Sequence, residues 1–142
     1  VLGSPPPRPP AIFPEARRRL GDRVVHFGHV PDRAAYARWL WAADVLPVTS
    51  RHDFFGISVL EAVYCRTFPL LPHDLAYPEL IPEAWRERCL YSDVEDLENR
   101  LRTIITADPP PRWDLNGLWA AAAGYAWERM APVYDRILEG LG

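Results

Sequence analysis

Residues 50–65 combine two carboxylates and a glycine in a pattern that suits a ligand site. A loop carrying Asp53 runs through Gly56 into an apolar segment, where Glu61 is the only residue charged at neutral pH between Phe54 and Cys65. A carboxylate on an apolar helix is strongly disfavoured unless a partner hydrogen-bonds it. The pattern therefore predicts a partner for Glu61, which is either a bound ligand or, in the alternative of a plain core helix, a nearby arginine.

The element before this stretch is a short apolar run, Asp44–Thr49, of the kind that forms a buried parallel strand. Strand, loop and helix then follow in order. Such a unit points the amide N–H groups and the positive dipole end of its helix at the carboxyl end of the strand, where open α/β sheets bind ligands. Gly56 would let the backbone approach that ligand closely.

The rest of the chain alternates strands and helices, which predicts an α/β fold with a Rossmann-like, doubly wound parallel sheet and helices on both faces. Predicted strands lie at 24–28, 68–72 and 89–91. Predicted helices begin near Pro14 and at Pro31–Asp32, and a third follows the capping box Ser92-x-x-Glu95. Residues 73–82 are too rich in proline for a regular element, so we expect a functional loop there.

Residues 112–142 are predicted to form a C-terminal helical segment whose aromatic stripe belongs to the core. Pro132 should kink or split it. Residues 5–10 are five prolines and an arginine, which predict a stiff linker or, alternatively, a polyproline ligand. The chain begins at Val1 without an initiator Met, so we expect residues 1–142 to be one domain from a longer two-domain protein.

Composition excludes several function classes. The net charge is −3, and every one of the 16 cations is an arginine, which leaves no polybasic tail and no strong nucleic-acid footprint. Cys65 and Cys89 lack metal-site spacing, so we predict two buried thiols in a reducing compartment and no metal site. No apolar run approaches the length of a membrane span, and we expect a cytoplasmic protein with no membrane partner.

The residues of the predicted site also carry a family resemblance. Asp53-x7-Glu61, with Phe55-Gly56 inside it, resembles the acid-x7-Glu motif in the donor half of retaining GT-B glycosyltransferases. Residues 68–72 and Tyr77-Pro78-Glu79 resemble that family's next strand and its Pro-Glu loop. Within the family, residues 52–56, 60–65 and 74–79 are most similar to the tRNA-queuosine α-mannosyltransferases. Two positions depart from the pattern, since Asp53 replaces the usual Glu and Arg66 stands where Gly is common.

The resemblance implies roles for particular residues. Glu61 would accept hydrogen bonds from the donor's ribose, and Asp53 would bond the hydroxyls of its sugar. His52 would assist Asp53 or be a surface residue, and Glu79 would bond a donor hydroxyl or cap a turn. The remaining donor-binding candidates are backbone segments: the amides of Phe55, Gly56, Ile57 and Ser58 at the sugar and phosphates, and the turn Gly28, His29 and Val30 beside the nucleobase, unless it is an ordinary turn.

The resemblance further implies an enzyme that transfers mannose from GDP-mannose to queuosine in tRNA, without a cofactor or a metal. The Arg and Lys that clamp the donor diphosphate in this family would lie before Val1, so this piece alone should be inactive. The tRNA would be held mainly by a preceding N-terminal half. The alternatives are a transferase using a UDP-sugar or another acceptor, a sugar-nucleotide epimerase, and a nucleotide-binding module that catalyses nothing.

Overall fold

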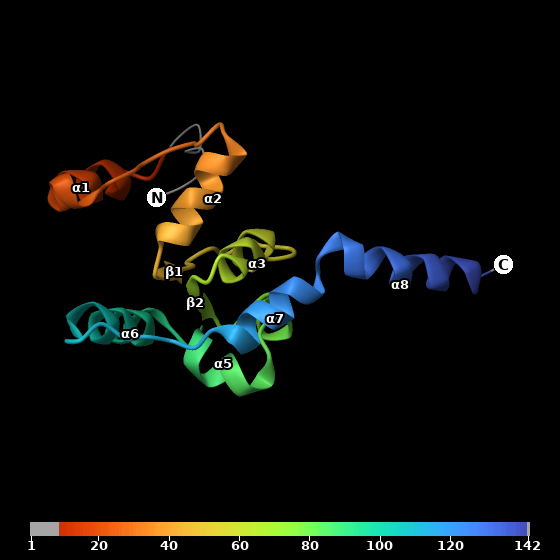
Figure 1. Cartoon of the computed structure of the whole chain (residues 1–142). Coiled ribbons are helices and arrows are strands. Elements are labelled where there is room, and N and C mark those ends of the chain that lie inside the picture. The colour runs from red at the N-terminus through yellow and green to blue at the C-terminus, as the bar shows by residue number, and fades with distance from the viewer. Residues whose placement is uncertain (1–8, 142) are drawn as a thin grey trace. The chain divides into compact units, whose positions relative to one another are not determined.

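The computed structural model describes residues 9–141. The predictions for residues 1–8, which include most of the proline-rich linker, lie outside this range. The chain divides into two compact units, and the boundary between Trp39 and Leu40 falls inside a helix (Figure 1). We call the part up to Trp39 the first unit and the part from Leu40 the second unit.

The first unit contains α1 (Ile12–Leu20), the 3-10 turn η1 (Gly21–Arg23) and most of α2 (Arg33–Ala42). Both predicted helices are confirmed. On α1 the Glu15 carboxylate accepts hydrogen bonds from Arg18 and Arg19, at 2.8 and 2.7 Å. The carboxylate of Asp32 accepts hydrogen bonds from the backbone N–H groups of residues 34 and 35, so it caps the start of α2.

The strand predicted at 24–28 is wrong as a continuous element. Residues 24–27 have no regular structure, and within the segment only Gly28 forms a β-bridge. Apolar patterning alone does not make a strand, because a strand is stabilised by paired neighbours along its length. The predicted repeat of strand, loop and helix in this part of the chain is therefore reduced to the helix.

The second unit is built on a three-stranded parallel sheet in the order β1-β2-β3, formed by β1 (Val45–Pro47), β2 (Phe68–Pro72) and β3 (Leu90–Tyr91). All four residues from Phe68 to Leu71 are buried, so both faces of β2 are covered. Strand β1 lies at the edge of this sheet and is only partly buried, which tolerates its Pro47. The α/β class and the parallel sheet are confirmed.

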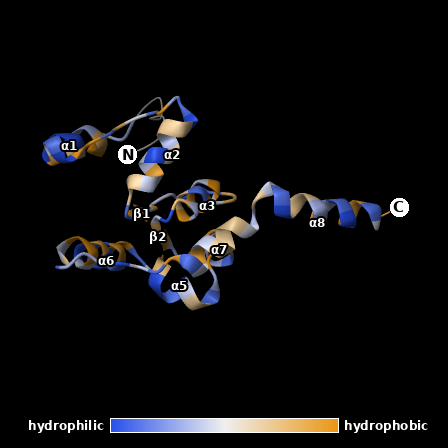
Figure 2. Ribbon diagram, viewed as in Figure 1, coloured by the Kyte–Doolittle hydropathy of each residue, from blue (hydrophilic) through white to orange (hydrophobic). Residues whose placement is uncertain are grey.

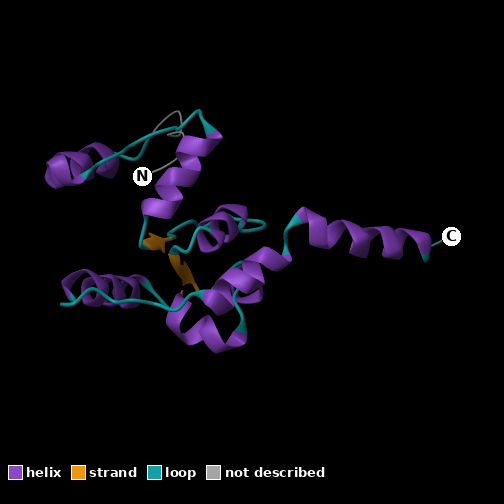
Figure 3. Ribbon diagram, viewed as in Figure 1, coloured by secondary structure: helices purple, strands orange, loops and turns teal. Residues whose placement is uncertain are grey.

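In the described residues the second unit also contains the helices α3 (Ile57–Tyr64), α4 (Tyr77–Leu80), α5 (Glu83–Cys89), α6 (Val94–Thr106), α7 (Asn116–Gly124) and α8 (Trp127–Glu139). Figure 3 draws helices in purple and strands in orange. Helix α4 lies in the segment that was expected to be irregular. Pro78 is its second residue, where the backbone N–H would have no helical partner, so the proline does not prevent the turn. The predicted Pro-Glu loop is therefore partly a short helix.

The core of the second unit joins both faces of the sheet to α3, α4, α5, α6 and α7. Two aromatic stacks tie the C-terminal part to it: Phe68 on Trp113 at 4.6 Å and Tyr64 on Trp119 at 5.8 Å between ring centroids. Both cysteines are buried free thiols, as predicted. The buried cluster consists of Val59, Val63, Phe68, Leu70, Leu71, Tyr77, Ile81, Cys89, Leu90, Tyr91, Leu97, Leu115, Leu118 and Ala122.

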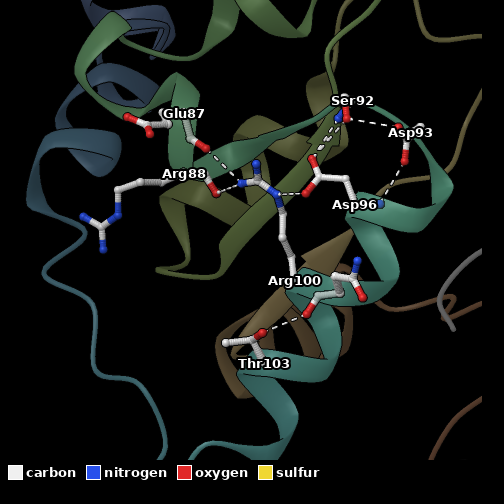
Figure 4. A network of polar contacts seen from close by, with 8 residues as sticks. Glu87, Arg88, Ser92, Asp93, Asp96, Arg100 and Thr103 are labelled. Carbon is white, nitrogen blue, oxygen red and sulfur yellow. Dashed lines mark hydrogen bonds and ion pairs between the residues drawn. The ribbon is translucent and has the colours of Figure 1, made fainter.

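Helix α6 begins one residue later than its predicted capping box. The N-cap is Asp93, whose carboxylate accepts a hydrogen bond from the backbone N–H of Asp96 at 2.9 Å. Asp96 in turn accepts hydrogen bonds from the N–H of Ser92 and from Arg100, which also donates to the carbonyl of Glu87 (Figure 4). Aspartate caps as well as serine does, so sequence alone could not choose between adjacent candidates.

Helix α3 ends in a Schellman motif, whose left-handed position is taken by Arg66 rather than by the usual glycine. The N–H of Thr67 donates to the carbonyl of Ala62, and the N–H of Arg66 to that of Val63, at 3.0 Å each. Arg66 has φ of 68°, in the left-handed region that glycine prefers. Its guanidinium donates to Asn116 at 2.7 Å, so the cation lies at the C-terminal end of the helix as expected.

The C-terminal segment splits at Tyr125–Ala126, so the predicted split at Pro132 is wrong, while a kink at Pro132 stays a prediction. Ala126 is extended, with ψ of 139°, whereas Pro132 lies within α8. Gly124 weakens the end of α7, and the last turn closes with bonds of the shorter i to i−3 kind. Figure 2 shows hydrophilic and hydrophobic residues alternating along α8, which has no buried residue, so the core prediction holds for α7 but not for α8.

None of the helices in the described residues is long and apolar enough to span a membrane.

Candidate functional site

The predicted site lies in the second unit, in the loop between β1 and α3. The loop leaves the sheet at the carboxyl end of β1, the edge at which parallel sheets bind ligands. At its base the N–H of Val48 donates to the carbonyl of Leu70 at 2.9 Å, and the Tyr91 hydroxyl donates to the carbonyl of Val48 at 2.7 Å. The start of the loop is thus fixed to β2 and to β3.

Asp53 organises the rest of this loop. Its Oδ1 accepts hydrogen bonds from the N–H of Gly56 at 2.7 Å and of Phe55 at 3.1 Å, and its Oδ2 accepts one from the Tyr77 hydroxyl at 3.0 Å. The Gly56 bond is the main cause that lowers the pKa of Asp53 below its ordinary value, against the opposing effect of burial. An ionised carboxylate has about four acceptor positions. Three are occupied here, so about one remains for a ligand.

Gly56 is required by the packing of the protein itself. Its φ of 66° is left-handed, and a Cβ at this position would overlap Leu80 Cδ1 and lie 3.6 Å from the ring of Tyr77. The space beside Gly56 is therefore filled by α4. The sequence pattern had predicted this glycine for a different reason, the close approach of a ligand.

Helix α3 presents its N-terminus to the same loop. The first N–H groups of a helix have no intrahelical partner, so the amides of Ile57 and Ser58 are available to an anion. Phe54, Phe55 and Ile57 are 96%, 64% and 61% exposed, so the start of the helix is flanked by apolar surface. The segment Phe55–Ser58 therefore offers both amide donors and apolar contacts.

Glu61 lies on α3 just over one helical turn from Ile57. It is half-buried and interacts with another group of the protein. Its charge raises the pKa of Cys65, one turn further on, although burial of the thiol is the larger cause. Binding of a ribose by Glu61 stays a prediction.

The other predicted residues are distributed as follows. His52 is exposed, and its backbone exchanges two hydrogen bonds with the Ser50 side chain. Glu79 is exposed on α4, the helix that also supplies Tyr77. Gly28, His29 and Val30 belong to the first unit, so their proposed role stays a prediction. Tyr77 was not predicted from the sequence, where its only signal was its place directly before Pro78-Glu79.

Comparisons with known proteins agree with the motif. A 74-residue segment, 52% of this chain, is 38% identical to a tRNA-queuosine alpha-mannosyltransferase of Drosophila melanogaster. The chain is similar to glycosyltransferases. It is also 37% identical over 79 residues, 53% of this chain, to a D-inositol 3-phosphate glycosyltransferase of Jonesia denitrificans. A third relative, a GDP-mannose-dependent alpha-(1-6)-phosphatidylinositol dimannoside mannosyltransferase of Mycobacterium tuberculosis, is 29% identical over 115 residues, 81% of this chain.

The matched segments span 19%, 18% and 29% of these relatives, so each relative contains much that this chain does not match. No family model and no solved structure matches the chain. The resemblance predicted from residues 52–79 is thus confirmed at the level of glycosyltransferases, which include mannosyltransferases.

Proposed function

We propose that this chain is the donor-binding part of a retaining glycosyltransferase that transfers mannose from GDP-mannose to queuosine in tRNA. One observation carries the proposal. The Asp53-x7-Glu61 motif lies where the carboxyl end of β1 meets the N-terminus of α3, in a chain similar to mannosyltransferases. A tRNA acceptor would place the reaction in the cytoplasm.

The donor is the better supported of the two substrates. Two relatives are named as mannosyltransferases, and the one that aligns with 81% of this chain is named as GDP-mannose-dependent. Their names give different acceptors, a tRNA nucleoside and a phosphatidylinositol mannoside. Mannose is thus common to both, whereas the queuosine acceptor rests on the 38% identical relative alone.

The site has groups that suit part of such a donor, apart from the diphosphate clamp expected before Val1. The free amides at the start of α3 and the dipole of that helix suit the diphosphate, which gains negative charge as it leaves. Asp53 keeps about one acceptor position for a sugar hydroxyl. Glu61 would accept hydrogen bonds from the ribose. The bond from the anomeric carbon to phosphate breaks as a bond to the acceptor oxygen forms, and the acceptor's proton passes to the leaving phosphate.

The test is a transfer assay with the complete protein. Radiolabelled GDP-mannose and UDP-glucose are each supplied with queuosine-containing tRNA and, as a control, with the same tRNA lacking queuosine. We expect label to reach only queuosine-containing tRNA, and only from GDP-mannose. Transfer from UDP-glucose with GDP-mannose silent would contradict the donor, and equal labelling of both tRNAs would contradict the acceptor. Saturable donor binding with no transfer to any acceptor would instead indicate a nucleotide-binding module.

A further inference from the structure

Helix α4 holds the motif loop at two points, although it is separated from the loop by α3 and β2 in the sequence. The Tyr77 hydroxyl donates to Asp53 Oδ2 at 3.0 Å, and Leu80 fills the space beside Gly56. Tyr77 is completely buried, with 0% of its surface exposed, so the core fixes the position of its ring. A rigid donor therefore reaches the carboxylate from outside its own loop.

This contact limits the motion of the Asp53 carboxylate. The two amide bonds hold Oδ1 and restrict rotation about the Cβ–Cγ bond, but both come from the motif loop itself and move with it. The bond from Tyr77 fixes the second oxygen. The acceptor position that remains on Asp53 then points in one direction before any ligand arrives.

We propose that Tyr77 is a positioning residue, which presets the Asp53 carboxylate for the sugar of the donor and links the motif loop to the helix that carries Glu79. This inference rests on the proposed function, because it assigns Asp53 to the donor. Protein side chains that are already ordered in the free protein lose less conformational entropy when the ligand binds and when it reacts. The single turn of α4 would thus place Asp53, through Tyr77, and Glu79, which it carries, for one ligand.

The experiment compares Tyr77→Phe with the matched control Tyr91→Phe in the complete protein. Tyr91 is also buried, with 7% exposed, and its hydroxyl donates to the carbonyl of Val48 rather than to Asp53. Each variant loses one hydroxyl and one hydrogen bond from the same core. The two variants should therefore lose similar stability. Tyr91→Phe frees the start of the loop at Val48, whereas only Tyr77→Phe removes the bond to Asp53.

The first measurement is hydrogen exchange at the amides of Phe55 and Gly56 in the protein without ligand. A hydrogen bond is worth about 0.5–1.5 kcal/mol net, so exchange in Tyr77→Phe should be roughly 2- to 13-fold faster. Tyr91→Phe should leave these two amides at the rate of the unmodified protein. Unchanged exchange in Tyr77→Phe, or equal acceleration in both variants, would overturn the proposal.

The second measurement is turnover at saturating GDP-mannose. Tyr77→Phe should lower kcat about 2- to 13-fold with a smaller effect on donor binding. In the Asp53→Asn background the same change should have almost no further effect, because Tyr77 acts through Asp53. Independent, multiplying effects would overturn the positioning role and leave the proposed function intact. If the unmodified protein neither binds GDP-mannose nor transfers its sugar, the donor assignment is overturned, whatever the exchange rates show.

Discussion

Replacing Gly56 by alanine tests whether the motif loop is held by α4 as the structure indicates. The residue has φ of 66° and ψ of 28°, and the added Cβ would overlap Leu80 Cδ1. Two separate penalties result. One is the left-handed backbone of a residue with a Cβ, and the other is the overlap with a half-buried leucine.

The first penalty is about 1–2 kcal/mol, the usual cost of a left-handed conformation for a residue other than glycine. The second is about 1–3 kcal/mol, typical of an extra methyl group in a packed region. The end of Leu80 can move in part, which favours the lower half of that range. We therefore expect Gly56→Ala to lower the free energy of unfolding by roughly 2–4 kcal/mol.

The assay is urea unfolding of four proteins: unmodified, Gly56→Ala, Leu80→Ala and the double variant. Shortening Leu80 removes the overlapping atom, so the double variant should be more stable than the sum of the single effects predicts. Gly124→Ala is the control, because Gly124 has no neighbour within 4 Å of an added Cβ, and it lies in α7, where alanine is the better helix former. A loss below about 1 kcal/mol for Gly56→Ala, or strictly additive effects with Leu80→Ala, would refute the reasoning.

Four further predictions concern single side chains. Glu61→Gln should raise the dissociation constant for GDP-mannose about 10- to 100-fold by calorimetry, because a hydrogen bond to a charged group is worth about 1.5–3 kcal/mol; donor binding equal to that of the unmodified protein would make Glu61 structural. Asp53→Asn should lower kcat at saturating donor more than it weakens donor binding, and a change confined to binding would contradict contact with the reacting sugar. The pKa of Asp53 is lowered in the folded state, so ionised Asp53 stabilises the fold fully above its unfolded pKa of about 3.9, and this stabilisation is lost as the pH falls through the folded pKa. The urea midpoint of the unmodified protein should therefore fall over this acid range, and the midpoint of Asp53→Asn should fall less. Burial raises the pKa of Cys89 to about 12, so the thiol should resist a disulfide reagent at pH 8 until urea unfolds the protein, and rapid labelling of the folded protein would contradict its burial.

Features that depend on neighbours in the sequence were predictable. The apolar runs of β1 and β2, the glycine before α3 and the spacing of Asp53 and Glu61 placed strand, loop and helix correctly. The same local signals found α1, and the carboxylate of Asp32 that caps α2. Each of these depends on backbone propensity, capping or periodicity within about one or two turns of chain.

Features that depend on distant partners were not predictable. Residues 24–27 have the composition of a strand but are irregular in the part of the chain that the structure describes, and the break after α7 is at Tyr125–Ala126 rather than at Pro132. Asp53 was predicted as a ligand group, but the structure shows that it also accepts a hydrogen bond from Tyr77, which lies 24 positions away in the sequence.

The sequence alone determined the class of the protein and the location of its candidate site, because the motif, its strand and its helix are consecutive. Only the tertiary structure decided how that site is held. The contacts of Asp53 with Tyr77, of Gly56 with Leu80 and of Val48 with Tyr91 all join segments that meet only after β2 has been placed beside β1 and β3 beside β2. The order of strands in a sheet fixes which side chains meet, and no local pattern records it.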